Sequence, residues 1–261
     1  MKAVLLFPGQ GAQKVGMGKD LYDTYPEARA MMDAAVAALG YSLTQVRFEG
    51  PDAELTRTCN CQPALYLHGL ALYKMLSSMV DIEPVAAAGL SLGEFTAHAA
   101  AGTFSMEDGL KLVQKRGAFM EDACNAAPST MAAMIGGSDE AVAALAAECD
   151  IDVANYNCPG QTVVSGSVEG VDKAVAGAKA AGFKIAKKLN VAGAYHSRFM
   201  KSAQEALRPE LESTPMQTPA VPVYCTYEAR PVTGPEDVRA MLGEQVCGSV
   251  RWAARMKDLP D

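Results

Sequence analysis

The sequence predicts a three-layer α/β domain that carries an inserted ferredoxin-like unit, and three observations indicate this fold class. Apolar, strand-like runs alternate with helix-like segments along most of the 261 residues, which indicates parallel strands joined by crossover helices. Residues 128–191 instead show the order βαββαβ, which is typical of the ferredoxin-like unit. A Gly-x-Ser-x-Gly turn between an apolar run and an Ala-rich segment is typical of α/β enzymes.

Apolar runs and helical spacing define the elements of the main domain. Lys2–Phe7 predicts a buried first strand because it is short, apolar and followed by Pro-Gly, and Pro84–Leu90 predicts a second strand. The predicted helices are Pro26–Leu39, Gln62–Val80, Phe95–Ala101 and Met106–Asn125. Ser105, with Asp108 three residues later, gives the last of these helices a start that resembles a capping box.

The inserted unit is predicted from six segments in succession. They are strand Thr130–Ile135, helix Asp139–Cys149, strands Asp152–Tyr156 and Gln161–Ser165, helix Val168–Ala181 and strand Phe183–Leu189. Val221–Thr226 then predicts a strand that we expect to rejoin the main sheet. The predicted core therefore comprises residues 1–127 and 192–261, and the predicted subdomain comprises residues 128–191.

Composition argues against several classes of protein. Hydrophobic residues make up 49% of the chain and charged residues 20%, as in a globular protein with a large core. No stretch approaches the roughly 18 consecutive apolar residues of a membrane span. The formal charge of −7 argues against a nucleic-acid partner. The seven cysteines lack CxxC spacing and only three histidines accompany them, so we expect no metal site and a reducing, cytoplasmic location.

Ser91 is the candidate nucleophile. It stands in the motif GLSLGE (residues 89–94), directly after an apolar run. In such a nucleophile elbow the turn is so sharp that glycines flank the serine, and the hydroxyl is left exposed. The start of the following helix would point N–H groups at negative charge beside Ser91. The pattern is short enough to recur by chance, so its interpretation depends on partner residues.

A serine nucleophile needs a base, and the chain offers His68, His98 and His196. His98 lies two turns along the helix that leaves Ser91, and His68 lies in an apolar helix, so a structural role is the simpler interpretation of both. His196 lies in a loop after a strand, where catalytic side chains are usually presented. We therefore expect His196 to be the base.

Arg116 projects from an apolar helical stripe that includes Val113 and Met120. An unpaired buried cation is very costly, so this guanidinium must either reach solvent along its stem or find an anion. Two interpretations stay open at this point. The anion is an internal Asp or Glu, or it is a substrate carboxylate gripped by both arms of the guanidinium.

The glycine loop around Gln10 follows the first strand. It is neither a dinucleotide fingerprint nor a P-loop, because Lys14 takes the third glycine position and Met17 follows Gly16. We expect the flanking glycines to let the backbone of Gln10 approach the Ser91 turn. A plain β-turn is the alternative interpretation.

Together these features resemble the malonyl-CoA:acyl-carrier-protein transacylases, over almost the whole chain. The matching motifs are FPGQGAQ (7–13), CQPA (61–64), GLSLGE (89–94), KRG (115–117), NYNCPGQ (155–161), YHS (195–197) and ARPV (229–232). Because several separate motifs occur in one order, the resemblance is far more specific than the Ser91 turn alone. It implies an α/β-hydrolase-like core with a ferredoxin-like subdomain, in agreement with the pattern of predicted elements.

The resemblance also implies a role for each matching residue. Ser91 is the nucleophile, His196 is its base, and the main-chain carbonyl of Gln245 orients the histidine. The main-chain N–H groups of Gln10 and Leu92 form the oxyanion hole. The substrate-binding residues are Arg116, which would hold the malonyl carboxylate, Gln161 and Lys184. Lys184 is a candidate contact for coenzyme A phosphates or an acidic carrier protein, with a solvated charged face as the alternative.

Three features depart from the family pattern. Leu90 takes a place often held by His, which is not a catalytic position, so we expect little effect. Gly248-Ser249 replaces an Asn-Pro pair, which leaves the Gln245 loop less rigid. Familiar members also continue past the position of Asp261 with a segment that bears a Gly-Pro-Gly turn near the active-site entrance.

The implied reaction moves a malonyl group from malonyl-CoA to Ser91 and then to the phosphopantetheine thiol of acyl carrier protein. The thioester is a substrate, so we expect no cofactor, and we expect a monomer. Two alternatives stay open. A serine hydrolase for carrier-bound acyl groups has no use for the Arg116 cation, and a non-catalytic docking module for the carrier protein would not need Ser91 and His196. Fatty-acid and polyketide synthesis are both compatible with the sequence.

Overall fold

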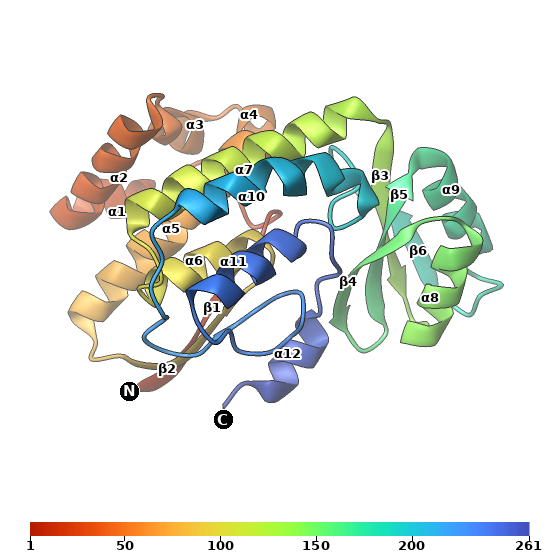
Figure 1. The fold of residues 1–261 in the computed structure, drawn as a ribbon. Helices are drawn as coiled ribbons and strands as arrows, with labels where there is room; N and C mark the ends of the chain where they lie inside the picture. The colour runs from red at the N-terminus through yellow and green to blue at the C-terminus, as the bar shows by residue number, and fades with distance from the viewer. Residues whose placement is uncertain (261) are drawn as a thin grey trace.

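The computed structural model describes residues 1–260 and shows an α/β chain with two separate sheets (Figure 1). The larger part of the molecule is built on a parallel sheet of order β1-β2-β7, formed by Lys2–Phe7, Glu83–Gly89 and Val223–Tyr224. The smaller part is an antiparallel sheet at one end of the molecule. The α/β class with a parallel main sheet is therefore confirmed. Asp261, the last residue of the predicted core, lies outside the described residues.

Helices surround the parallel sheet; the four predicted helices are among them, and the sequence did not predict the others. They are α1 (Lys19–Thr24), α2 (Pro26–Leu39), α3 (Leu43–Glu49), α4 (Asp52–Thr56), α5 (Thr58–Met79), α6 (Leu92–Ala100), α7 (Met106–Ala126), α10 (Lys201–Ser213), α11 (Pro235–Glu244) and α12 (Trp252–Asp258), with a 3₁₀ turn at Arg198–Met200. Two of them begin earlier than predicted, α5 at Thr58 and α6 at Leu92. The early start of α6 places its first turn directly after Ser91.

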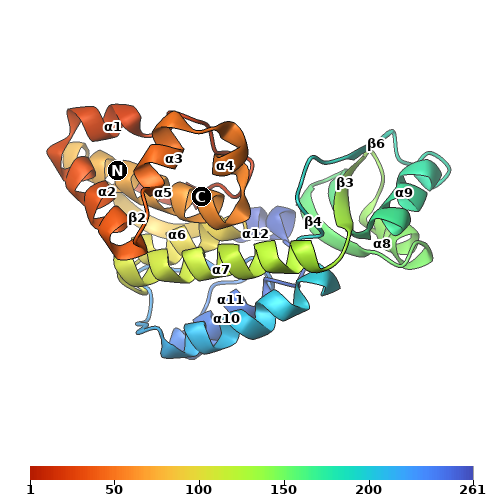
Figure 2. The same cartoon turned by 90° about the horizontal axis from the view of Figure 1, so that it is seen from above.

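The antiparallel sheet has the strand order β4-β5-β3-β6 and its own small core. Its elements follow the predicted βαββαβ order: β3 (Ser129–Ile135), α8 (Asp139–Glu148), β4 (Asp152–Cys158), β5 (Gln161–Ser167), α9 (Val168–Gly177) and β6 (Ile185–Lys188). All three strand pairs in this sheet are antiparallel. Figure 2 shows this unit beyond the end of α7, which leads directly into β3.

The C-terminal part of the chain ties the small sheet to the main part. Val250 donates its N–H to the oxygen of Ala154 at 2.7 Å and its oxygen accepts the N–H of Tyr156 at 2.9 Å, so it lies beside β4 in a parallel bridge. The hydroxyl of Ser249 also donates to the oxygen of Val153 at 2.6 Å. These bonds fix the segment that follows α11, and that segment begins with Gln245.

Strand β7 is shorter than the predicted Val221–Thr226 because its flanking backbone groups bond elsewhere. The N–H of Cys225 donates to the oxygen of Arg230, and the N–H of Thr226 donates to a carboxylate oxygen of Glu94 at 2.8 Å. The strand thus gives way to a turn beside the start of α6. No helix within residues 1–260 has the length and apolar character that crossing a membrane would require.

Candidate active site

Ser91 lies on a sharp turn between β2 and α6. Its backbone has φ 53° and ψ −106°, a conformation that is strained for a residue with a side chain. A Cβ atom on Gly89 would lie 1.9 Å from the carbonyl carbon of Gly93, and one on Gly93 would lie 2.2 Å from the oxygen of Phe7. The two glycines therefore allow the helix start, the turn and β1 to meet at backbone distance.

His196 is the histidine that reaches Ser91. Its Nε2 lies 2.8 Å from Ser91 Oγ, and its Nδ1 lies 2.8 Å from the main-chain oxygen of Gln245. A carbonyl oxygen only accepts hydrogen bonds, so Nδ1 carries the proton and Nε2 is left to accept the hydroxyl proton of Ser91. His196 has a positive φ of 55°, which turns the ring from its loop towards the serine.

Burial keeps His196 neutral. Desolvation is the largest cause, and the charge of Arg116 the second, of a pKa lowered to about 4. The base form is therefore present at neutral pH. The other two histidines lie elsewhere: His98 contacts Thr103 inside the core, with its pKa lowered by burial to about 3, and His68 packs beside Gly18.

Arg116 reaches the nucleophile from α7. Its side chain is 1% exposed, and its Nη2 donates to Ser91 Oγ at 3.0 Å and to Gln245 Oε1 at 2.8 Å. Its Nη1 donates to Gln62 Oε1 at 2.7 Å, and its guanidinium lies 5.4 Å from the ring centre of Phe95. Burial lowers its pKa to about 10, so it stays charged at neutral pH.

The guanidinium of Arg116 is held by neutral oxygens. No carboxylate lies within ion-pair distance of it among residues 1–260, and its Nε has no hydrogen-bond partner there. A buried cation in this state is costly, and an incoming carboxylate would relieve the cost. Of the two sequence-based interpretations, the structure does not supply the internal Asp or Glu partner.

A pocket of about 190 Å³ opens at Ser91 between the two sheets. Its polar wall comprises Gln10, Gln62, Ser91, Arg116, Asn155, Asn157 and His196. Its apolar wall comprises Leu90, Leu92, Met120, Met131, Val163, Leu189, Val191 and Tyr195. Since Met131, Val163 and Asn155 come from the antiparallel sheet, both parts of the molecule build the pocket.

Gln10 and Leu92 lie at the pocket on either side of the Ser91 turn. Leu92 is the first residue of α6, where main-chain N–H groups have no partner within the helix. Within the part of the chain that the structure describes, neither the N–H of Gln10 nor that of Leu92 bonds to a protein acceptor. Both N–H groups are thus available to a negative oxygen at the pocket.

Gln161 and Lys184 lie outside the pocket. Gln161 is exposed where β5 begins, and its closest polar contact is the thiol of Cys158 at 4.0 Å. Lys184 is exposed just before β6, with its stem against Gly136. Both side chains therefore lie outside the lining around Ser91, and their expected role in substrate binding stays a prediction.

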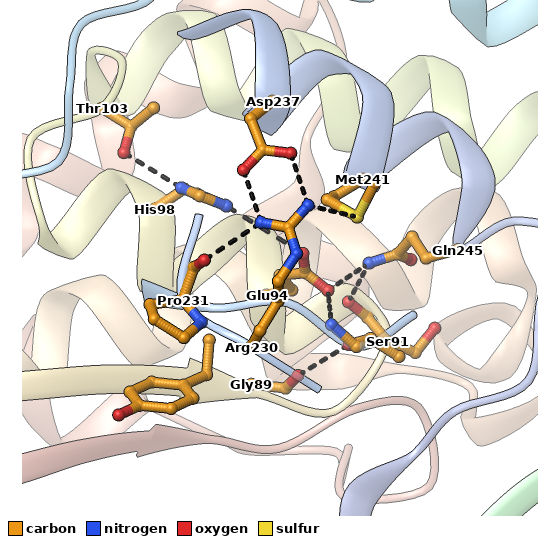
Figure 3. A network of polar contacts seen from close by, with 12 residues as sticks. Gly89, Ser91, Glu94, His98, Thr103, Arg230, Pro231, Asp237, Met241 and Gln245 are labelled. Atoms are coloured by element: carbon orange, nitrogen blue, oxygen red, sulfur yellow. Dashed lines mark hydrogen bonds and ion pairs between the residues drawn. The ribbon is translucent and has the colours of Figure 1, made fainter. Parts of the chain in front are cut away.

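Two polar residues that sequence reasoning did not single out belong to the site. Gln62 accepts a hydrogen bond from Arg116. Figure 3 shows the second residue, Glu94, which accepts a hydrogen bond from the side chain of Gln245 beside the Ser91 turn. Both are buried polar groups in otherwise apolar helical stretches, which is rare without a partner. That contrast could have identified them, although it would not have named their partners.

Comparison with known proteins agrees with this geometry. Residues 4–258 match the family described as the acyl transferase domain. The malonyl CoA-acyl carrier protein transacylase of Bacillus subtilis is 39% identical over 263 residues, which cover 99% of this chain and 83% of that protein.

Solved structures show the same relationship. The structure of the malonyl CoA-acyl carrier protein transacylase from Coxiella burnetii has a TM-score of 0.94 at 32% identity, and the match covers 97% of this chain and 82% of that one. A malonyl-transacylase in complex with its type II PKS acyl-carrier protein has a TM-score of 0.93 at 32% identity, over 97% and 84% of the two chains. This chain belongs to the acyl transferase domain family.

Proposed function

We propose that this protein transfers a malonyl group from malonyl-CoA to the phosphopantetheine thiol of acyl carrier protein, through an ester on Ser91. The observation that carries the proposal is the contact of 3.0 Å between Arg116 Nη2 and Ser91 Oγ. It places a buried cation without a carboxylate partner directly at the nucleophile, where the acid group of a malonyl thioester would lie. The names of the relatives support the same donor and acceptor.

In the first half-reaction, Ser91 Oγ attacks the thioester carbonyl while His196 Nε2 takes its proton. The N–H groups of Gln10 and Leu92 stabilise the negative oxygen that forms. Collapse of this intermediate breaks the C–S bond, and His196 returns the proton to the departing thiolate of coenzyme A. The main-chain oxygen of Gln245 supports His196 while the ring carries its positive charge.

The second half-reaction reverses the roles. The carrier thiol gives its proton to His196 Nε2 and attacks the ester carbonyl, and the oxygen of Ser91 leaves with that proton. Water must be kept away from the ester between the two steps, and the apolar wall of the pocket serves this purpose. No redox or metal step is needed for this exchange, and we propose that no cofactor takes part besides the thioester substrates.

We also propose where the larger substrates lie. Exposed Lys184, with Lys187 nearby on the sheet edge, would meet phosphates of coenzyme A or acidic groups of the carrier protein. Gln161 would contribute only an outer contact from the neighbouring hairpin. We propose further that the protein works as a monomer in the cytoplasm.

For the architecture, we propose an α/β-hydrolase-like core of residues 1–127 and 192–261 with a ferredoxin-like subdomain of residues 128–191. The strand-to-helix turn at Ser91 supports the first assignment, and the βαββαβ order with strand order β4-β5-β3-β6 supports the second. In this division the small unit would close one side of the pocket, and the residues proposed to carry out the reaction would lie on the core.

Intact-mass measurement tests the proposed function. Brief exposure to malonyl-CoA should add one malonyl group, and Ser91→Ala should abolish the addition. Later addition of a phosphopantetheine-bearing carrier protein should move the group to that protein. If the ester instead disappears at the same rate with and without the carrier, the protein is a hydrolase and the proposal is wrong.

A further inference from the structure

Glu94 is a buried carboxylate next to the catalytic turn. It lies on α6 three residues after Ser91, and its side chain is 0% exposed. Its Oε2 accepts the N–H of Thr226 at 2.8 Å and Nε2 of Gln245 at 2.8 Å. Its Oε1 lies 4.0 Å from Nε2 of His98, which is neutral, so this contact is not an ion pair. A charge buried this deeply calls for a reason beyond packing.

The side chain of Gln245 links Glu94 to the Ser91 turn (Figure 3). Its Nε2 donates to Glu94 and, at 3.3 Å, to the main-chain oxygen of Ser91, while its Oε1 accepts Nη2 of Arg116. The amide has only this orientation, because a carboxylate cannot donate and a guanidinium cannot accept. The main-chain oxygen of the same residue holds Nδ1 of His196.

We propose that Glu94 is a positioning residue, whose carboxylate locks the amide of Gln245 and thereby fixes both the carbonyl that orients His196 and the oxygen that holds Arg116. This inference rests on the proposed function. Gln245 is the first residue after α11, where the helix no longer fixes its backbone by hydrogen bonds on both sides. Its anchored side chain then adds to the backbone bonds of this segment in setting where its main-chain oxygen points.

The charge of Glu94 fits the same role. Burial raises its pKa, while hydrogen bonds from Thr226 and the charge of Arg255 act against that rise. In turn its negative charge favours the charged forms of Arg116 and Arg255.

Two substitutions separate the parts of this role. Glu94→Gln keeps an oxygen that can accept from Thr226 and Gln245, whereas Glu94→Met has a similar length but no acceptor. We expect Glu94→Met to slow acylation of Ser91 by about 10- to 100-fold, the scale for groups that orient a functional imidazole. Glu94→Gln should stay within about tenfold. Equal losses in both variants would overturn the proposal.

The orientation of His196 provides a readout that mere loss of stability would not change. The chain has three histidines, so ¹⁵N spectra of labelled imidazoles can be assigned with single variants. Wild type and Glu94→Gln should show the Nδ1–H form of His196, and Glu94→Met should show the Nε2–H form that a free neutral imidazole prefers. A folded Glu94→Met with the Nδ1–H form intact would contradict the proposal.

Asp237→Asn is the matched control. Asp237 lies on α11, the helix that leads to Gln245, and pairs with Arg230 at 2.7 Å, but it does not contact the amide of Gln245 (Figure 3). This substitution should lower stability and leave the His196 spectrum and the acylation rate within about threefold of wild type. A shift of the His196 signal in this variant would assign the effect to α11 in general and overturn the specific role of Glu94.

A substitution at Gln245 covers the case in which Glu94→Met folds poorly, and the double variant tests the coupling when Glu94→Met does fold. Gln245→Met removes the amide but keeps the main-chain oxygen, so it should give the same loss of the Nδ1–H form. If Glu94 acts through Gln245, the double variant loses no more activity than Gln245→Met alone. Multiplied losses would overturn the proposal. Should wild type fail to accept malonyl from malonyl-CoA, the proposed function fails, while the spectra still test the positioning role.

Discussion

The main-chain oxygen of Gln245 lies 2.8 Å from Nδ1 of His196, in the position where a serine triad commonly has a carboxylate. A carbonyl fixes the tautomer of the ring without a negative charge beside the substrate. The positive charge of Arg116 at Ser91 Oγ is therefore not matched by a triad carboxylate, and we propose that it is left for a malonyl group. On this proposal, the group that orients His196 also bears on which acyl group the pocket selects.

Removal of the base should have a large effect. His196→Ala should slow acylation of Ser91 by several orders of magnitude, because nucleophile and base act as a unit. Rapid-quench measurement of malonyl-enzyme formation checks this expectation. His68→Ala serves as the control, since His68 packs beside Gly18, and it should cost less than about tenfold. A greater loss in the control than in His196→Ala would refute the choice of base.

The pH profile should report the buried state of His196. Its pKa is lowered to about 4, first by desolvation and then by Arg116. The catalytic base is the neutral form, so kcat/KM should stay level from pH 8 down to about 5 and fall below that as the ring gains a proton. Measurement of kcat/KM for malonyl-CoA across this range checks the prediction. An acid limb centred near pH 6.5, the value of an unperturbed imidazole, would contradict it.

Close backbone contact at the turn should make Gly93 intolerant of a side chain. The added Cβ of Gly93→Ala would lie 2.2 Å from the oxygen of Phe7, a backbone atom that cannot rotate away. The free energy of unfolding should fall by about 1–3 kcal/mol or more, the range for overpacking, as chemical denaturation would show. Gly177→Ala is the control, since its Cβ would meet only Leu145 at 3.6 Å. A fall in Gly177→Ala as large as that in Gly93→Ala would contradict this explanation.

Much of the fold could be predicted because residues with strong local conformational preferences mark the ends of several helices and strands. The structure has α2 at the predicted Pro26–Leu39, where Pro26 begins the helix and Gly40 ends it in the left-handed conformation. Strand β1 likewise ends where Pro8 follows the apolar run. By contrast, β7 ends early because Thr226 donates to Glu94, and no local pattern predicts a bond between residues 132 positions apart.

Like the fold, the site was predictable where short sequence motifs mark its residues. Ser91 and His196 stand in short motifs, and the structure places their reacting atoms 2.8 Å apart. The contacts of Gln62 and Glu94 join distant segments, so the roles of these side chains can be recognised only in the folded structure. For Lys184 the sequence leaves two interpretations, a contact for coenzyme A phosphates or a carrier protein and a solvated charged face, and its exposed side chain is compatible with both.

Arg116 provides the test that separates a malonyl transferase from an enzyme for neutral acyl groups. Arg116→Ala would leave the malonyl carboxylate buried and unpaired, which should cost about 3–5 kcal/mol, the scale for breaking one side of a buried ion pair. At about 1.4 kcal/mol per factor of ten, kcat/KM for malonyl-CoA should fall by roughly a hundred- to several-thousand-fold.

Acetyl-CoA brings no carboxylate, so its turnover by Arg116→Ala should change little or rise, and the preference of the enzyme should move towards neutral acyl groups. Arg47→Ala is the matched control, because Arg47 is also fully buried but donates to the oxygen of Met17, and neither residue lines the pocket. This control should lower stability and keep the preference for malonyl. Parallel assays of both thioesters decide the matter: if Arg116→Ala loses activity on them in equal proportion, Arg116 supports the structure and does not select the substrate.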